Sequence, residues 1–569
     1  MIGLIIDIII IYMFSQSVAR GQLTFNLRKK GYLFYNLLCV YLVYSFLSIF
    51  ISYHHVVIII MLILFYVISL TMYYVHEFRG TNVNFSDILS LNTAKEVASG
   101  YKYKIKPIFV INLLFIIEEY IRRTNILKFL FNIRYISDLW TKNGTTDLIL
   151  KLRVNFVPLV MFLIVYFVLR YKIMKGRYDY SLSAGENEGY LYNFFSSIPI
   201  FYKKEKSSDE THISLKVEDF DKISDNIDGI DRPHIIVIMD ESFGIAQHKV
   251  KTNAEVTPYY DNLHDVTKGN LYVNTFGGGT ANTEFEFLTG MSIGNYSYPV
   301  MPYNNFVKSD KYSLARYFKR LNYKTLAMHP YTATNYHRDE VYKRFGFDEL
   351  LFYDDFTYKG TVREFVSDEA FYKEVIYQYE SRKDSDRLFM FGITMQNHSG
   401  YQNFDGMEIE AEVSGKEGKE SLDSYLSLMK ISDTALKTLI DYFENEKEHV
   451  IILFFGDHNA SFGTEINKMV YGDSLNYECN DQYQTPLFIY DNKVKMDSFI
   501  EATSANFLSL ELLDKAKLPY DEFHKELKNV YNKYNVYNYH KRKSRVDGTL
   551  SYIPYDDYMK IEAEYLERL

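Results

Sequence analysis

The first 175 residues consist of long, nearly uninterrupted apolar runs joined by short polar connections. The runs at 32–53 and 56–76 are each long enough to cross a bilayer core of about 30 Å as a helix. A run at 155–171 is a third candidate, and the shorter runs at 2–14 and 107–118 fit either a span or an interfacial helix. This pattern predicts a membrane domain over these residues with about five transmembrane helices.

Three features of this region allow more than one interpretation. Segment 78–104 has the spacing of a short amphipathic helix on the membrane surface, or it is a packing loop between spans. Asp7 is either a functional acid inside the membrane or an interfacial residue. The basic clusters at 28–30 and 172–177 favour a cytoplasmic location for the polar remainder of the chain, whereas the basic loop at 122–153 favours the opposite arrangement.

A polar stretch at 176–230 has no sustained period and predicts a linker. Beyond it, short apolar runs end abruptly in polar residues, and the first of them, HIIVIM, is followed by Asp240 and Glu241. Four more runs share this design: KTLAM before His329, RLFMFGITMQN before His398, HVIILFFG before Asp457 and His458, and TPLFIY before Asp491. Such runs are typical of parallel strands that are buried on both faces.

Helical stretches at 313–322 and 424–446 lie between these strands. Strands that alternate with helices predict an α/β domain with a mainly parallel central sheet, here over 231–520. A charged, Tyr-rich tail follows over 521–569. Its basic run fits a solvated surface, or a contact with an anionic lipid surface or polymer.

Several polar side chains are predicted to meet at one edge of this sheet. In parallel sheets, ligands bind outside the carboxyl ends of the strands. The side chains that four strands bring to that edge are Glu241, His329, His398, Asp457 and His458. Each of them alone fits a hydrogen-bonded structural role, whereas their convergence predicts a binding site.

Three glycines at 277–279 precede Thr280 at the predicted start of a helix. Glycines let the backbone turn tightly and approach a ligand, and a helix N-terminus favours an anion. Thr280 is then either an ordinary helix cap or a nucleophile. A divalent cation held by Glu241, Asp457 and His458 would lower the pKa of the threonine hydroxyl, which otherwise is far too high for attack at neutral pH.

Composition narrows the classes of ligand. The formal net charge of -9, with no basic block before the tail, argues against nucleic acid. No lysine follows the glycines, so the loop does not match the phosphate-binding loop of nucleotide enzymes. The two cysteines, Cys39 and Cys479, lie far apart in unlike segments, which argues against a disulfide framework or a cysteine zinc site.

With these motifs assembled, the chain resembles the lipoteichoic acid synthase family of phosphoglycerol transferases, from the apolar runs to roughly residue 520. The segments that carry the resemblance are DESFG, FGGGTANTEFEFLTG, NYHRDEVYKRFGFD, QNHSGY and FFGDH. Their order and spacing together are specific. The resemblance implies a polytopic membrane enzyme whose extracellular catalytic domain has the alkaline phosphatase and sulfatase fold.

The resemblance also implies two sets of site residues. The implied metal ligands are Glu241, Thr280, Asp457 and His458, and Thr280 is in addition the nucleophile that carries the glycerol phosphate group. The implied contacts to the phosphate and glycerol of the substrate are His329, Tyr336, Arg338 and His398, and His398 is also the candidate to transfer a proton. One Mn²⁺ or Mg²⁺ ion suits a carboxylate-rich site with one histidine, and Zn²⁺ is a further candidate.

The chain departs from the staphylococcal-type members of this family at two places. Tyr336 follows Asn335 where those enzymes have a tryptophan after an aromatic residue, and Asn459, Ala460 and Ser461 replace an aromatic-glycine turn. Both changes bear on the acceptor or head group and leave the implied metal ligands intact. Sulfatase chemistry is disfavoured, because the nucleophile position lacks the Cys or Ser followed by x-Pro-x-Arg that formylglycine formation requires.

The expected function is therefore metal-dependent transfer of glycerol phosphate from phosphatidylglycerol to a glycolipid, cell-envelope glycopolymer or teichoic acid acceptor, through a phospho-threonine intermediate. The resemblance places this reaction on the outer face of the cell membrane, which overrides the charge rule. No nucleotide or nucleic acid is expected as a partner. The alternatives are a phosphoethanolamine transferase or phosphodiesterase of the same fold, and a non-catalytic membrane protein that binds wall polymer.

Overall fold

The fold is seen in a computed structural model of the chain. It describes residues 2–23, 30–51, 53–79, 82–83, 105–123, 156–175, 189–203, 232–293, 301–305, 307, 309–385, 387–413, 415, 418–472, 481–537 and 542–544. Most of segment 78–104, predicted as an amphipathic helix or a packing loop, most of the linker at 176–230 and the end of the tail lie outside these residues, and 78–79 are the last residues of a helix. The chain forms two compact units, which divide near Ser207.

The N-terminal unit consists of helices. Their bounds are α1 Ile2–Arg20, α2 Tyr32–Phe50, α3 His54–Arg79, α5 Pro107–Arg123, α8 Phe156–Lys175 and α10 Tyr190–Lys203. By length and composition, three helices in the described part can cross a membrane, over Gly3–Arg20, Tyr32–Phe50 and His54–His76. Helices α5 and α8 lie where two further spans are predicted, and the total of five stays a prediction. Helix α10 lies within the predicted linker, because 190–203 is itself rich in apolar residues.

Asp7 belongs to a polar cluster inside the helical unit. His54 Nε2 lies 2.9 Å from Asp7 Oδ2, and Arg123 donates to Asp7 Oδ1. Arg123 Nε also donates to Glu119 Oε2 at 2.6 Å. Asp7 therefore links α1 to α3 and α5, and this pairing gives the acid a structural role.

The second unit is built on an eight-stranded sheet with the order β10-β2-β9-β8-β1-β7-β3-β4. The strand bounds are β1 His234–Asp240, β2 Thr267–Tyr272, β3 Tyr323–Met328, β4 Glu349–Leu351, β7 Arg387–Ile393, β8 Val450–Gly456, β9 Gln484–Asp491 and β10 Ser498–Ser504. Neighbouring strands are parallel except at β9, which runs antiparallel to both β2 and β8. The predicted mainly parallel sheet is confirmed.

One strand direction was predicted wrongly. The run TPLFIYD forms β9, but its antiparallel direction puts Asp491 at the opposite edge of the sheet from the other strand ends. There, Asp491 Oδ1 lies 3.0 Å from His449 Nε2, at the start of β8. A continuous apolar run predicts that a strand is buried on both faces, but it does not predict whether the strand runs parallel or antiparallel to its neighbours.

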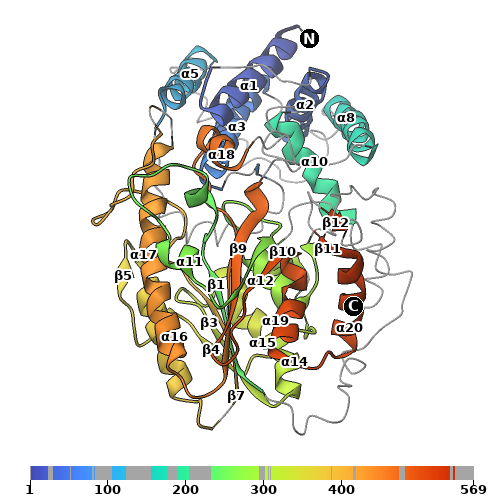
Figure 1. The fold of residues 1–569 in the computed structure, drawn as a ribbon. Helices are drawn as coiled ribbons and strands as arrows, with labels where there is room; N and C mark the ends of the chain where they lie inside the picture. The colour runs from blue at the N-terminus through green and yellow to red at the C-terminus, as the bar shows by residue number, and fades with distance from the viewer. Residues whose placement is uncertain are drawn as a thin grey trace. The chain divides into compact units, whose positions relative to one another are not determined.

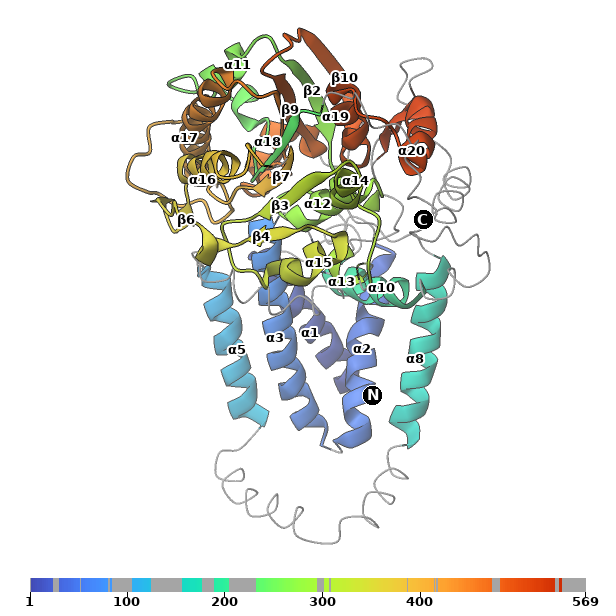
Figure 2. The ribbon, with the colours of Figure 1, turned by 90° about the horizontal axis from the view of Figure 1, so that it is seen from below.

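Two layers of helices cover the sheet. Figure 1 and Figure 2 show α16 (Asp368–Glu380) and α17 (Lys419–Glu444) on one face, with α12 (Thr280–Thr289), α14 (Leu314–Arg320) and α19 (Leu508–Ala516) on the other. Strands β1 and β8 are buried along their whole length for this reason. The remaining elements are α11 Pro258–Asn262, α13 Pro302–Asn305, α15 Arg338–Phe345, α18 Thr464–Tyr471, α20 Glu522–Lys533, and the hairpins β5 Thr361–Val362 with β6 Phe365–Val366 and β11 Tyr534–Tyr537 with β12 Arg542–Ser544.

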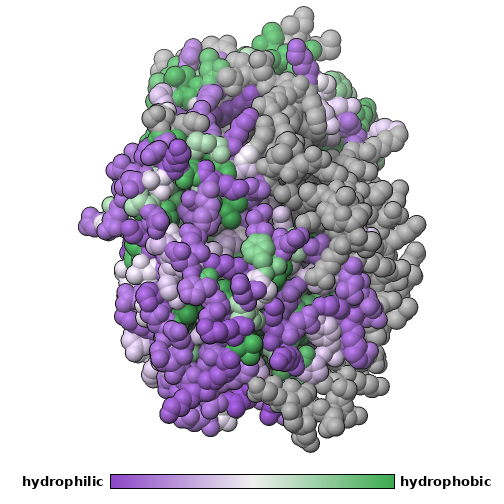
Figure 3. Space-filling view, viewed as in Figure 1, coloured by the Kyte–Doolittle hydropathy of each residue, from purple (hydrophilic) through white to green (hydrophobic). Residues whose placement is uncertain are grey.

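The two units differ in the surface that they expose. Figure 3 shows a mainly hydrophilic surface over the visible part of the second unit. The N-terminal helices instead expose many large apolar side chains, among them Ile5, Val110, Leu114 and Phe167. Such surfaces are expected of helices that face lipid. Within the second unit, Phe523, Leu527 and Tyr531 of α20 join a buried apolar cluster, so the first part of the predicted tail is packed.

Candidate active site

The turn after β1 joins two buried acids. Glu241 follows the strand directly, and Ser242 adopts a left-handed conformation with φ of 55°. The Ser242 backbone N–H donates to Asp457 Oδ1 at 2.7 Å, while its Oγ donates to Glu241 Oε1 at 2.9 Å. Ser242 thereby fixes both carboxylates, as residues around metal ligands commonly do.

Asp457 and His458 follow the adjacent strand β8. Asp240 pairs with Gly456 in the register of β1 and β8, so the residues that come next meet at the same edge. A Cβ on Gly456 would lie 1.9 Å from the Phe243 carbonyl oxygen, which explains the glycine before Asp457. His458 Nε2 lies 3.2 Å from Asp457 Oδ2 and 3.6 Å from Glu241 Oε1.

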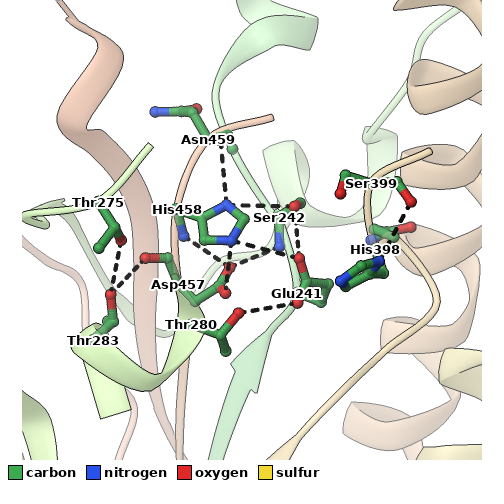
Figure 4. Close-up of polar contacts among 12 residues, drawn as sticks. Glu241, Ser242, Thr275, Thr280, Thr283, His398, Ser399, Asp457, His458 and Asn459 are labelled. Carbon is green, nitrogen blue, oxygen red and sulfur yellow. Dashed lines mark hydrogen bonds and ion pairs between the residues drawn. The ribbon is translucent and has the colours of Figure 1, made fainter. Parts of the chain in front are cut away.

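The glycine loop brings Thr280 to these residues. Gly277, Gly278 and Gly279 all have positive φ angles, and Gly279 rather than Thr280 is the N-cap of α12. The Thr280 hydroxyl donates to Glu241 Oε2 at 3.3 Å (Figure 4). This geometry separates the two interpretations of Thr280, because the side chain is directed at an acid of the site and not at the helix backbone.

The three side chains Glu241, Asp457 and His458 fit a cation. Each offers one ligand atom, and these atoms all lie within 4.8 Å of one another. Asp457 Oδ2 and His458 Nε2 are buried and make no hydrogen bond to any described residue. Burial, and then the charge of Asp457, raise the pKa of Glu241, and burial also raises the pKa of Asp457. A divalent cation would offset the cost of burying these two negative charges, because it attracts both carboxylates. It would also give Asp457 Oδ2 and His458 Nε2 a partner.

His398 and His329 lie on the turns after β7 and β3, at the same edge of the sheet. His398 is half-buried, and its Nδ1 lies 3.3 Å from the Ser399 carbonyl oxygen. His329 is fully buried, and its Nδ1 lies 3.4 Å from the Ile393 carbonyl oxygen. Burial lowers the pKa of both imidazoles, so both are neutral at pH 7. Neutral imidazoles can accept or donate one hydrogen bond to a substrate.

Arg338 is held by the protein itself. Its Nε and Nη2 donate to Glu284, and its Nη1 donates to Asn335 Oδ1 at 3.1 Å. Tyr336 also has a left-handed conformation, with φ of 54°, and its ring centre lies 5.0 Å from the Arg338 guanidinium. The predicted contacts of Arg338 and Tyr336 with substrate stay predictions, and the observed contacts give Arg338 a role in tying α15 to α12.

The sequence analysis assigns no role to two residues around the site, Ser242 and Glu284, and it does not foresee the backbone contacts of a third, Asn459. Ser242 holds both acids, and Glu284 receives Arg338 one turn after Thr280. Asn459 was singled out as a departure that bears on the acceptor, but its side chain is buried and bonded to the backbone. Its Oδ1 accepts from Ile245 N at 2.9 Å, and its Nδ2 donates to Gln482 O at 3.0 Å. Ser242 and Asn459 each lie directly next to a predicted ligand, which is the signal that the sequence offers for them, whereas Glu284 carries no such signal.

The sequence of this chain is similar to those of several known proteins. A family model described as Sulfatase matches residues 233–516. The chain is 30% identical over 313 residues to a putative cyclic beta-1,2-glucan modification protein of Rhizobium meliloti, a match that covers 53% of this chain and 48% of that protein. It is 27% identical over 242 residues to lipoteichoic acid synthase of Staphylococcus aureus, over 40% of this chain and 36% of that protein. The chain thus spans less than half the length of both relatives.

A solved structure supports the same fold. Streptococcus pyogenes phosphoglycerol transferase GacH in complex with sn-glycerol-1-phosphate matches with a TM-score of 0.50 and 22% sequence identity, over 65% of this chain and 91% of that chain. The match to the family model covers every strand of the sheet and each of the residues that line the candidate site. Residues 233–516 therefore belong to the Sulfatase family, and part of the chain is similar to lipoteichoic acid synthase.

Proposed function

We propose that this chain is a membrane-anchored, metal-dependent phosphotransferase that moves glycerol phosphate from phosphatidylglycerol to a cell-envelope glycan or polymer. One observation carries the proposal: the buried atoms of Glu241, Asp457 and His458 converge beside the Thr280 hydroxyl. The names of the relatives, lipoteichoic acid synthase and phosphoglycerol transferase, agree with this chemistry. The apolar N-terminal helices give access to a lipid donor.

Glu241, Asp457 and His458 are the residues that would hold the cation, together with Thr280 as the resemblance implies. A bound Mn²⁺ or Mg²⁺ supplies a lower pKa for the threonine hydroxyl and neutralises charge on the phosphoryl oxygens. Zn²⁺ is an alternative because the site contains an imidazole. Ser242 keeps both carboxylates in place through its backbone N–H and its hydroxyl.

The first step forms a bond between Thr280 Oγ1 and the phosphorus of the lipid head group. The bond from phosphorus to the diacylglycerol oxygen breaks, and the proton lost by Thr280 ends on the released diacylglycerol hydroxyl. In the second step, an acceptor hydroxyl attacks the phosphorus, the bond to Thr280 breaks, and the acceptor proton ends on the threonine. Glycerol phosphate is transferred, and the enzyme returns to its initial state.

His398 is the residue that we assign to carry these protons. It lies on the turn after β7, and the charge of Glu241 acts on its imidazole. Since burial lowers its pKa, the imidazole is neutral and can accept a proton from an attacking hydroxyl. His329 and Arg338 are proposed to orient the phosphate and glycerol groups, and the charge of Arg338 acts on the buried His329 imidazole.

The proposal places the catalytic unit on the outer face of the cell membrane, where a lipid-linked donor and a growing envelope polymer meet. A lipid donor reaches an anchored enzyme by diffusion in the plane of the bilayer, so no nucleotide is required. The acceptor is proposed as a glycan, glycolipid or teichoic chain. The name of the Rhizobium meliloti relative, a glucan modification protein, agrees with a glycan acceptor.

Mass spectrometry of the purified full chain tests the proposal. The chain is incubated with Mn²⁺ and phosphatidylglycerol, and the peptide that contains Thr280 is expected to gain the mass of glycerol phosphate. Thr280→Ala is expected to gain nothing, while Thr289→Ala, at the other end of the same helix, keeps the adduct, because the Thr289 hydroxyl donates to the Phe285 carbonyl oxygen and is not bonded to a proposed ligand. An adduct from phosphatidylethanolamine in place of phosphatidylglycerol would favour a phosphoethanolamine transferase. Absence of adduct from either lipid, with no release of diacylglycerol, would contradict the function.

A further inference from the structure

The turn that carries His398 is held by an arginine from a separate hairpin. Arg363 lies between β5 and β6, a two-stranded hairpin outside the main sheet. Its Nη2 donates to the carbonyl oxygens of Gln396 and His398, both at 2.8 Å, and its Nη1 donates to the Gly400 carbonyl oxygen at 3.4 Å. One planar guanidinium thus joins three alternate residues of the turn, an arrangement that the ammonium group of lysine cannot reproduce.

The backbone of the hairpin has an unusual conformation at Arg363. Arg363 has φ of 57°, in the left-handed region that residues other than glycine rarely adopt. Such a conformation persists where the surroundings hold it, and it often marks a functional position. Its neighbour Glu364 is exposed. The backbone strain therefore accompanies the side chain that reaches the His398 turn.

Two aromatic side chains, Phe365 and Tyr401, also contact this turn. The Phe365 ring lies 5.2 Å from the His398 ring, and the Arg363 guanidinium lies 5.2 Å above the Phe365 ring. The guanidinium also lies 6.0 Å from the ring of Tyr401, whose hydroxyl donates to the Asn397 carbonyl oxygen at 3.0 Å. Both the backbone and the imidazole of His398 are therefore fixed by residues that include Arg363.

Charges from several elements act on the His398 imidazole. Glu241 after β1 favours the protonated form, whereas Arg363 on the hairpin and His458 after β8 disfavour it. His329 after β3 is near enough to interact with it electrostatically. Loss of the Arg363 charge would thus shift the balance towards the imidazolium form.

We propose that Arg363 is a positioning residue of the transfer reaction, which fixes the His398 turn so that the imidazole faces the reacting groups. This inference rests on the proposed function, in which His398 carries protons. The hydrogen bonds of Arg363 described above all go to the His398 turn, and its guanidinium packs on Phe365 beside the imidazole. We therefore assign its effect to His398.

Three variants of the full chain test this inference. Arg363→Met removes the donors and the charge, Arg363→Lys keeps the charge with a different geometry, and Glu364→Gln is the control on the same hairpin. Arg363→Met is expected to lower kcat for lipid turnover by about 10- to 100-fold, as misplaced catalytic groups do, and to leave Mn²⁺ affinity within about twofold. Arg363→Lys is expected to recover part of kcat, and Glu364→Gln all of it.

A second measurement does not depend on turnover. Diethyl pyrocarbonate modifies neutral imidazoles, and peptide mass spectrometry gives the modification rate of His398 by itself. The ratio of the rates at pH 6 and pH 8 cancels changes in accessibility. Arg363→Met is expected to lower this ratio because more imidazolium is present at pH 6, whereas Arg363→Lys keeps the wild-type ratio.

The outcomes separate the two proposals. A wild-type chain that turns over neither lipid would contradict the proposed function, while the modification ratio would still report whether Arg363 controls His398. An Arg363→Met variant with wild-type kcat and wild-type ratio would overturn the inference. So would a loss of Mn²⁺ affinity and of thermal stability in proportion to the loss of kcat, because the role of Arg363 would then be general to the fold.

Discussion

Asp457 uses its two carboxylate oxygens differently. Oδ1 accepts hydrogen bonds from the backbone N–H groups of Ser242 and His458, at 2.7 and 2.8 Å, whereas Oδ2 makes none within the described part of the chain. The first oxygen holds the turn together, and the second is left for a cation. In an asparagine at this position, the amide oxygen can still accept the two backbone hydrogen bonds. The amide nitrogen in place of Oδ2 carries no negative charge and cannot bind a cation.

Asp457→Asn is therefore expected to separate folding from metal binding. In metal-free buffer its melting temperature should equal or exceed that of the wild type, because a buried charge beside Glu241 is removed. The rise in melting temperature on addition of Mn²⁺ should disappear. Asp491→Asn is the matched control, since Asp491 is buried and its Oδ1 accepts from the backbone N–H groups of Lys493 and Val494, but it lies outside the cluster. A metal-free Asp457→Asn protein that is clearly less stable would contradict this division of roles.

Glu286 predicts a pH dependence of stability. Burial raises its pKa from 4.5 to about 7, although Oε1 accepts from Asn274, Ser292 and the Ile293 N–H. The folded protein then holds a proton that the unfolded chain releases near pH 4.5. The contribution of Glu286 to the free energy of unfolding is therefore greatest below pH 4.5, and it falls by about 3 kcal/mol as the pH rises to 7. Glu286→Gln should flatten this part of the urea-denaturation profile, and a variant with an unchanged slope between pH 5 and 7 would contradict the assignment.

The residues at the sheet edge could be predicted because each directly follows an apolar run. Glu241, His329, His398, Asp457 and His458 all lie on turns at that edge, as expected. Ser242 and Glu284 could not be predicted in the same way. Their contacts depend on the left-handed turn at Ser242 and on the packing of α15 against α12, and neither feature leaves a local pattern in the sequence.

At the scale of elements, helix α12 is held in place by an ion pair. Glu284, four residues after Thr280, accepts from Arg338 and from the hydroxyls of Tyr303 and Tyr342, at 2.8 and 2.6 Å. All four side chains are buried. Helix α12, which carries Thr280, is thereby tied to α15 and α13, and Arg338 compensates the charge of Glu284.

A double-mutant cycle can distinguish this structural role of Arg338 from a contact with phosphate. Arg338→Met should destabilise the fold by about 3–5 kcal/mol, because Glu284 is left as a buried, unpaired charge. Adding Glu284→Gln should recover most of that stability. If Arg338 also contacts the substrate phosphate, lipid turnover stays low in the double variant although the fold is restored. Full recovery of both stability and turnover would limit Arg338 to holding α12.

The elements of the sheet were predictable to different degrees. Buried central strands such as β1 and β8 have continuous apolar sequences, and both were predicted. Strands β4 and β10 were missed because they lie at the two edges, where the half-buried Glu349 and the exposed Glu501 interrupt the apolar pattern. The direction of β9 was missed because direction is decided by the connections and not by composition. The predicted site was unaffected, since no proposed ligand lies on β9.

At the scale of the whole molecule, the two units divide the task that we propose. The helical unit exposes apolar side chains that suit lipid, whereas the second unit contains the complete cluster of Glu241, Asp457, His458 and Thr280. None of these four residues comes from the helical unit. In the proposed reaction, metal binding and attack on phosphorus would therefore be properties of the second unit, and the helices would supply proximity to a donor that is confined to the bilayer.

Separating the units should therefore remove lipid turnover and leave the chemistry of the site. A protein of residues 208–569 is expected to fold, because its sheet and both helix layers lie within it. It should bind Mn²⁺ as the full chain does and hydrolyse a soluble phosphodiester such as bis-p-nitrophenyl phosphate at a similar rate. Its turnover of phosphatidylglycerol in vesicles should fall by about 100-fold or more, because anchoring no longer raises the effective concentration of donor. Thr280→Ala in the same fragment should remove the soluble activity, and equal turnover of vesicles by fragment and full chain would show that the helices do not serve access to the donor.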